Sequence, residues 1–186
     1  MRTAFKEWLI VVDALGRGDQ ILILRKGGIS EDSGTFQVDH PEFVLFPTLF
    51  HQQRDAVIPQ AQARYDDIAP SLPDPSLLRI EFLVRVVAWK KVQSLAAAER
   101  LKGQHIWRDE VIAQRYEWGG EKAVFALATR VYRLPRPVDL PMLPAYGGCK
   151  SWVELEPDLD VANAQPVLSD SAFSEKLKSF EAALGK

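Results

Sequence analysis

Two cations stand directly before a pair of glycines near the N-terminus. Arg25 and Lys26 end a short β-branched run, and Gly27 and Gly28 follow them. Cationic side chains beside the backbone amides of a glycine turn are suited to bind a small anion such as phosphate. The alternative is structural, because a charged strand end also needs glycine where the chain turns with positive φ. The pattern therefore predicts either an anion site or a plain turn.

Histidines and small polar residues flank an apolar stretch between residues 40 and 52. His40 and His51 stand near its two ends, and Thr48 and Gln52 lie close to His51. An imidazole can act as a general base, or it can hydrogen-bond the edge of a nucleobase. A histidine among apolar residues can equally be a structural side chain whose hydrogen bonds are satisfied. We take Thr48, His51 and Gln52 as candidate ligand contacts.

Aromatic and cationic side chains recur between residues 105 and 118. Trp107 follows His105, and Arg115 and Trp118 come one short helix later. Indole rings and a guanidinium can form a platform on which a flipped or single-stranded base stacks. Core packing by the two tryptophans is the alternative.

A glycine turn leads into the last expected strand at Tyr146–Trp152, and it carries Cys149 and Lys150. A thiol beside a lysine could be an activated nucleophile, but nothing in the sequence places a histidine next to it, so a buried, unreactive thiol is the default. Lys150 remains a candidate cation for ligand binding. One cysteine and three histidines show no metal-ligand spacing, so we expect no metal site.

No standard catalytic or cofactor fingerprint occurs in the chain. The glycine pair fits neither a Walker nor a dinucleotide-binding pattern, and neither Gly-x-Ser-x-Gly nor His-Glu-x-x-His is present. We expect no cofactor, and catalysis remains an open question.

Composition is that of a globular protein without a strong electrostatic field. The 186 residues include 23 basic and 25 acidic side chains, which give a formal net charge of −2. Any nucleic-acid affinity must therefore come from a local patch. No apolar run approaches the ~20 residues that span a bilayer, no secretory signal is visible at the start, and the single cysteine fits a reducing compartment. We expect a cytoplasmic protein without membrane contact.

Hydrophobic periodicity predicts the elements that position these groups. We expect helices over residues 5–15, 95–102, 109–116 and 170–184, with Ser94, Asp109 and Ser169 or Asp170 as N-terminal caps. Strands are expected over residues 20–26, 79–92, 122–134 and 151–155, with two short strands between 36 and 46. The segments 51–75 and 135–146 are rich in proline and are expected to be irregular.

Helices at both ends, with strands joined by irregular connections, argue against a doubly wound parallel sheet. We predict a single α+β domain over residues 1–186. Its mainly antiparallel sheet is expected to be curved or to form a partly open β-barrel, with flanking N- and C-terminal helices.

Several motifs together resemble a known family. The stretches 5–8, 21–29, 40–52, 105–107 and 146–152 are similar to the uncharacterised bacterial DUF1802 family over nearly the whole chain. The family has no established activity and no assigned catalytic residues, so the resemblance transfers none. Some relatives are associated with Mrr-type restriction endonuclease domains, which implies a restriction or defence context and a nuclease partner. The order of elements is also similar to PUA-like and ASCH-type barrels, which bind RNA or nucleotides.

Three functional hypotheses follow from the residues. The first is a binding module for a nucleotide or nucleic acid, with Arg25 and Lys26 on phosphate and Trp107 or Trp118 stacking. The second is a phosphodiester hydrolase that uses His51 as base and Lys26 to stabilise the oxyanion. The third is an interaction subunit that docks another protein through an aromatic surface. The oligomeric state is not predictable from these patterns.

Overall fold

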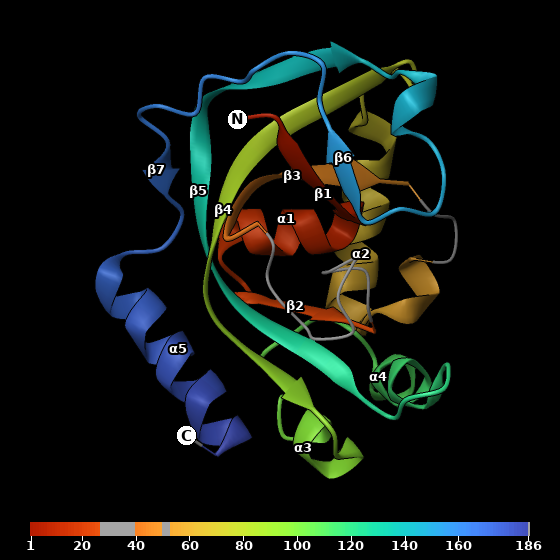
Figure 1. Ribbon diagram of the computed structural model, residues 1–186, viewed down its shortest axis with the longest axis vertical. Coiled ribbons are helices and arrows are strands. Elements are labelled where there is room, and N and C mark those ends of the chain that lie inside the picture. The colour runs from red at the N-terminus through yellow and green to blue at the C-terminus, as the bar shows by residue number, and fades with distance from the viewer. Residues whose placement is uncertain (27–39, 50–52, 186) are drawn as a thin grey trace.

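One curled, half-barrel sheet organises the protein, and helices pack against it (Figure 1). The computed structural model describes residues 1–26, 40–49 and 53–185. Within these ranges the strand order is β2–β5–β4–β3–β1–β6, and β7 pairs with β5. The strands are β1 (Thr3–Trp8), β2 (Leu22–Arg25), β3 (Glu42–Thr48), β4 (Leu77–Val92), β5 (Val124–Pro141), β6 (Trp152–Glu154) and β7 (Gln165–Pro166).

Five α-helices and three short 3₁₀ turns complete the described chain. The helices are α1 (Leu9–Arg17), α2 (Pro59–Ile68), α3 (Leu95–Glu99), α4 (Asp109–Glu117) and α5 (Asp170–Leu184), and the turns are η1 (Arg54–Ala56), η2 (Ala69–Ser71) and η3 (Pro144–Tyr146). Among the strand pairs that the structure describes, only β1 and β3 run parallel. The predicted α+β class with a curved, mainly antiparallel sheet and terminal helices is therefore confirmed.

The two longest strands, β4 and β5, form the spine of the sheet. They pair from Leu77–Pro141 to Val92–Val124 with two register shifts. The predicted strand over 79–92 is confirmed, but β5 runs well beyond the expected end at Leu134. Pro135 and Pro137 fall inside the first register shift, between the Ile80–Val138 and Phe82–Arg133 pairs. A bulge tolerates proline because it requires no ladder N–H at these positions, so the strand continues.

The N-terminal segment differs from the prediction of one helix over 5–15. Residues up to Trp8 form β1, which pairs with β3 on one side and β6 on the other, and α1 begins only at Leu9. Phe5 and Trp8 do have helical spacing relative to Leu9 and Val12, but pairing with two neighbouring strands overrides the local pattern.

The segment 51–75 was expected to be irregular, and this prediction is wrong for α2. The helix starts with Pro59 at its first position, where the missing N–H costs nothing. Only Ala61 of its residues is buried. Ala61, Tyr65 and Ile68 lie at helical spacing, and the latter two pack, partly buried, against the core. This stripe is short and stands among prolines, so its period is not evident in the sequence.

Caps define the other helices largely as predicted. The Ser94 and Ser169 side chains accept hydrogen bonds from Ala97 N and Ala172 N, at the starts of α3 and α5. Helix α4 is confirmed, but its N-cap is Arg108 rather than Asp109. Asp109 lies in the first turn and pairs with Lys102.

Strands β3 and β4 separate part-way along the sheet. Their pairing covers only Glu42–Arg85 to Val44–Leu83. Beyond that point β3 continues alongside β1 as far as the Trp8–Thr48 pair, whereas the start of β4 continues alongside β5. The facing edges of the two strands are therefore not joined to each other over Leu45–Thr48 and Leu77–Phe82.

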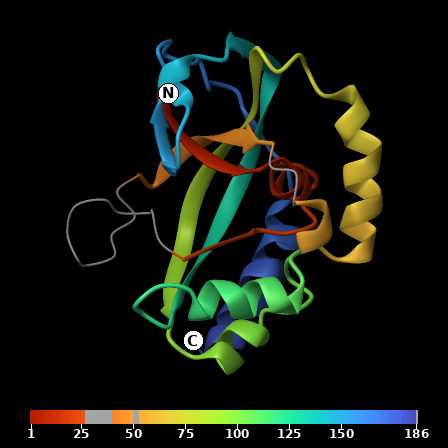
Figure 2. The same ribbon diagram turned by 90° about the vertical axis from the view of Figure 1, so that its right-hand side faces the viewer.

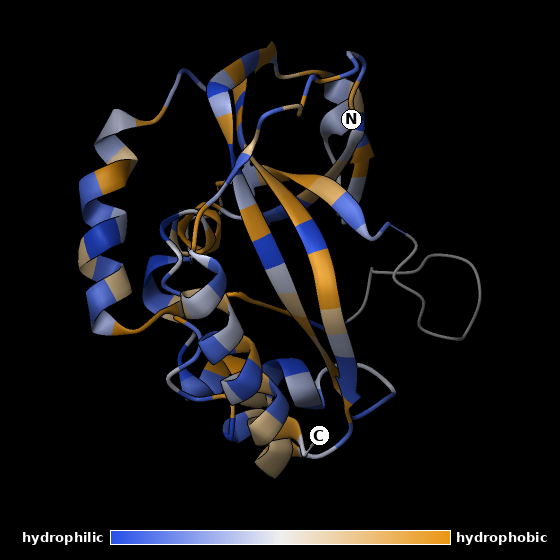
Figure 3. Cartoon of the chain, turned by 90° about the vertical axis from the view of Figure 1, so that its left-hand side faces the viewer, coloured by the Kyte–Doolittle hydropathy of each residue, from blue (hydrophilic) through white to orange (hydrophobic). Residues whose placement is uncertain are grey.

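Hydrophobic side chains are buried on both faces of the sheet. One cluster joins α1 and helices α3–α5 to residues 82–92 of β4 and 124–131 of β5. The other joins the opposite face of β1, β3 and β4 to Tyr146 and Leu155. Figure 3 shows α1, seen nearly end-on beside the sheet, in the colour of hydrophobic residues, whereas α2 alternates blue and pale segments with tan and orange ones. Helix α2 stands away from the sheet (Figure 2).

Close packing of α1 on the sheet predicts a cost for any side chain at Gly16. A Cβ there would lie 2.1 Å from Cζ of Phe82, whose ring is 6% exposed and is held beneath the Arg133 guanidinium. We expect Gly16→Ala to lower the free energy of unfolding by about 1–3 kcal/mol, because the ring must leave its packed position. Gly120→Ala is the matched control, since nothing lies within 4 Å of its added Cβ. Equal stabilities in urea denaturation would contradict this packing.

Candidate functional site

A groove of about 700 Å³ opens where β3 and β4 separate. Its walls come from α1, the end of β3, the beginning of β4, the η3 turn and residues 59–71, which form the α2–η2 arm or, for short, the α2 arm. This volume lies within the range of ~300–1,000 Å³ that is usual for small-molecule sites. The groove is therefore the candidate functional site.

The floor of the groove is apolar. Side chains from three elements contribute to it, among them Leu9 of α1, Leu45 and Phe46 of β3, and Phe82 of β4. At its mouth Met142 is 38% exposed. An apolar surface of this kind favours a ligand with a flat or aliphatic part.

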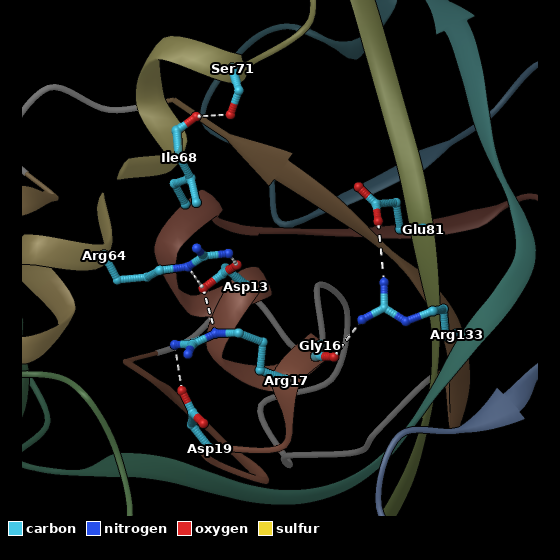
Figure 4. Close-up of polar contacts among 9 residues, drawn as sticks. All are labelled: Asp13, Gly16, Arg17, Asp19, Arg64, Ile68, Ser71, Glu81 and Arg133. Carbon is cyan, nitrogen blue, oxygen red and sulfur yellow. Dashed lines mark hydrogen bonds and ion pairs between the residues drawn. The ribbon is translucent and has the colours of Figure 1, made fainter. Parts of the chain in front are cut away.

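Ion pairs join the α2 wall to α1. Arg64 donates to both carboxylate oxygens of Asp13, at 2.9 and 3.1 Å, and Arg17 donates to the same carboxylate at 2.9 Å (Figure 4). Arg17 also pairs with Asp19. The bidentate Arg64–Asp13 pair therefore adds a directional polar contact to the apolar packing of Tyr65 and Ile68, and together they hold this wall in place.

The opposite wall also carries arginines. Arg133 donates to the Gly16 carbonyl at 2.9 Å, lies 3.5 Å from the Glu81 carboxylate and stacks over the Phe82 ring (Figure 4). Arg79 forms a bidentate pair with Asp139 at 2.7 and 2.8 Å.

Basic residues outnumber acidic ones along the groove. The lining includes Lys6, Arg17, Arg64, Arg79 and Arg133, against Asp13 and Glu81. Five cations and two anions leave a formal charge of +3 on the lining, although Asp19 and Asp139 pair with two of these arginines from outside it. An apolar floor between basic walls suits an anionic ligand with an apolar part.

Several sequence-predicted residues meet behind the groove, around the buried carboxylate of Glu7. Its Oε2 atom lies 3.7 Å from Arg25 and forms no hydrogen bond to the described residues, whereas Oε1 accepts from Trp8 N at 2.8 Å. The Thr48 hydroxyl donates to the Glu7 carbonyl at 3.0 Å. Arg25 also donates to the Ser151 hydroxyl at 2.7 Å, so both terminal nitrogens of its guanidinium have partners within the protein.

Arg115 and Trp107 belong to the same buried neighbourhood. The Arg115 guanidinium lies between the Trp8 and Trp107 rings, 4.9 and 4.8 Å from their centroids, and donates to the Leu24 carbonyl. Burial lowers the pKa of Arg115 to about 10, while Glu7 acts in the opposite direction. The side chain therefore stays charged at neutral pH. Trp107 is 1% exposed, so its ring packs against Arg115 in the interior.

The other predicted site residues lie apart from this cluster. Lys26 donates to the carbonyls of Tyr116, Glu121 and Ala123, which together use all three N–H groups of its ammonium. Trp118 is 73% exposed on the surface after α4.

Of the seven predicted site residues that the structure describes, only Thr48 lines the groove. Lys150 lies on the turn beside the groove and donates to the Ala145 carbonyl at 2.6 Å. Cys149 on the same turn is exposed, so the expectation of a buried thiol is wrong. His51 and Gln52 lie outside the described residues.

Apart from Thr48, sequence reasoning missed the residues that line the groove. Arg64 stands in a segment that was expected to be irregular, and Arg17 and Arg133 have no neighbouring motif. One signal in the sequence did point to this region. Charged residues between Asp13 and Asp19 follow an apolar helix, and such side chains must face either another element or solvent.

Comparison with known proteins gives one family. The chain matches the family described as Domain of unknown function (DUF1802) over residues 4–179, nearly its whole length. The chain belongs to the DUF1802 family. No curated protein and no solved structure matched it.

The described part of this DUF1802 protein shows two further features that bear on its chemistry. Within residues 1–26, 40–49 and 53–185, no cluster of three or more His, Cys, Asp or Glu side chains could hold a metal ion. In the same ranges, no helix has both the length and the apolar character needed to cross a bilayer.

The buried ion cluster of this DUF1802 protein predicts a large effect for neutralising Glu7. We expect Glu7→Gln to lower the free energy of unfolding by about 3 kcal/mol, because Arg25 and Arg115 would lose the carboxylate that compensates their buried charge. Glu42→Gln is the matched control, since Glu42 pairs with the exposed Arg85 and should contribute less than about 1 kcal/mol. Similar losses for both variants in chemical denaturation would contradict this account.

Proposed function

We propose that this protein binds a mononucleotide in the groove between the α2–η2 arm and the separated ends of β3 and β4. The observation that carries the proposal is the combination, in one hollow of about 700 Å³, of an apolar floor and basic walls. A nucleotide offers both complementary parts, since it has a flat base and an anionic phosphate.

The separated strands supply a further reason for this ligand class. Over Leu45–Thr48 and Leu77–Phe82 the facing edges of β3 and β4 are not paired with each other. Backbone N–H and C=O groups at such edges can hydrogen-bond the polar edge of a base. The aromatic rings of Phe46 and Phe82, both in the lining, offer apolar contact to its faces.

A single nucleotide is favoured over a nucleic-acid polymer on electrostatic grounds. Polymer binding depends on many cations that contact successive phosphates. The chain has a net charge of −2, and the groove arginines are already paired with carboxylates. These features support a ligand with one or a few phosphates.

A steric block tests the proposal. Isothermal titration with AMP, GMP, CMP and UMP, and with single-stranded DNA and RNA oligomers, should show binding of at least one mononucleotide. Met142→Trp should weaken that binding by about tenfold or more, because the indole would enter the mouth of the groove. Val87→Trp, at an exposed position outside the lining, is the matched control and should leave the affinity unchanged.

Two outcomes would contradict the proposal. Absence of binding by any of the mononucleotides would reject a nucleotide as ligand. Binding that Met142→Trp and Val87→Trp affect equally would place the site elsewhere on the protein.

A further inference from the structure

The cations around the groove fall into two groups with different electrostatic partners. Every arginine of the lining has a carboxylate partner: Asp13 and Asp19 for Arg17, Asp13 for Arg64, Asp139 for Arg79 and Glu81 for Arg133. An anionic ligand that approached these arginines would have to compete with carboxylates already in place. The charges of these arginines are therefore largely balanced by carboxylates, and the resulting ion pairs hold the walls together.

Lys6 and Lys150 have no such partner. Within the described residues neither ammonium forms an ion pair with a carboxylate, and each is bound instead to a backbone carbonyl of one turn. Lys6 donates to Gly148 at 3.1 Å, and Lys150 donates to Ala145 at 2.6 Å. An ammonium has three N–H groups, so two on each lysine remain available to a ligand.

The two lysines also act on each other. Burial and the charge of Lys150 both lower the pKa of Lys6, while Cys149 has a smaller, opposite effect. Two like charges held around one turn repel each other, and a bound anion would relieve that repulsion.

The turn itself can approach an anion closely. Gly147 lines the groove, and Gly148 has a φ of +83° with no atom within 4 Å of the position that a Cβ would occupy. The Gly147 N–H is already donated to the Pro144 carbonyl at 3.0 Å. The Gly148 N–H has no backbone acceptor among the described residues, so it is the amide of this turn that a ligand oxygen can reach. The turn also adjoins the aromatic part of the floor, because Lys6 lies over the Phe46 ring, which packs edge-on against Tyr146.

We infer that Lys6, Lys150 and the Gly148 amide form the phosphate subsite of the groove. The inference rests on the proposed function and adds an orientation to it: the phosphate lies at the η3 end, and the base extends along the apolar floor between Phe46 and the α2 arm. The arginines then act on the shape of the walls rather than on the phosphate.

Inorganic phosphate tests this subsite without relying on nucleotide binding. In ¹H–¹⁵N spectra of the full chain, phosphate should produce saturable shifts of the Gly147, Gly148 and Lys150 amide signals. The double variant Lys6→Gln with Lys150→Gln should abolish these shifts. The double variant Lys102→Gln with Lys122→Gln removes the same charge at two exposed lysines outside the groove and should retain them.

Affinities for AMP and adenosine give a second measurement. The Lys6 and Lys150 double Gln variant should weaken AMP binding by about tenfold or more, as expected for lost charge-assisted hydrogen bonds. Its affinity for adenosine should change less than about twofold, since the base contacts remain. Replacing both lysines with arginine should restore most of the AMP affinity.

The outcomes separate the two proposals. Phosphate shifts at the Arg17, Arg64 or Arg133 side-chain signals instead of the turn, or no shifts in the wild-type protein, would overturn the subsite. AMP binding that the double Gln variant leaves unchanged would overturn it too, while leaving the nucleotide proposal intact. Phosphate binding at the turn without any nucleotide binding would instead uphold the subsite and reject the nucleotide.

Discussion

The separation of β3 from β4 is the constraint on which the rest of the architecture depends. Beyond the Val44–Leu83 pair each strand follows a different neighbour, β3 with β1 and β4 with β5. The proline-containing bulge in β5 produces the first register shift between β4 and β5, and it bends these two strands at this level. The space between the two halves of such a sheet must be filled or lined by other elements. Here α1, η3 and the α2 arm line it.

A short apolar stripe and polar contacts together fix the outer wall of that space. Helix α2 buries Ala61 and packs Tyr65 and Ile68, partly buried, against the core. It is also tied to α1 by the Arg64–Asp13 pair, which is directional although exposed ion pairs add little stability. Only this narrow side of α2 is packed against its neighbours, and its end at Ile68 lines the groove.

Charges are arranged differently inside the protein and at the end of the groove. Glu7, Arg25 and Arg115 form a buried set in which, among the described residues, two cations share one carboxylate. Contacts of the Arg115 guanidinium with the Trp8 and Trp107 rings help to hold it. At the η3 turn Lys6 and Lys150 lack carboxylate partners among the described residues. This contrast is the physical reason for placing a ligand anion at the turn rather than among the arginines.

Sequence periodicity predicted the elements whose burial follows their own pattern. The alternating strand over 79–92 and the amphipathic helix from residue 170 are examples, since each buries one face or stripe. It failed for β1, where strand pairing overrides a helical spacing, and for α2, whose apolar stripe is short and stands among prolines. Local motifs located Lys150 and its glycine turn, but not Lys6 or the groove arginines, because tertiary contacts between distant segments bring those residues together.

A crystal structure of the protein grown with saturating AMP would test the central claim most directly. The account predicts density for the base between β3 and the start of β4, with phosphate oxygens within hydrogen-bonding distance of Lys6, Lys150 and the Gly148 amide. Ordered AMP bound instead at the Arg25–Lys26 strand end or on the exposed face of Trp118, with an empty groove, would contradict it.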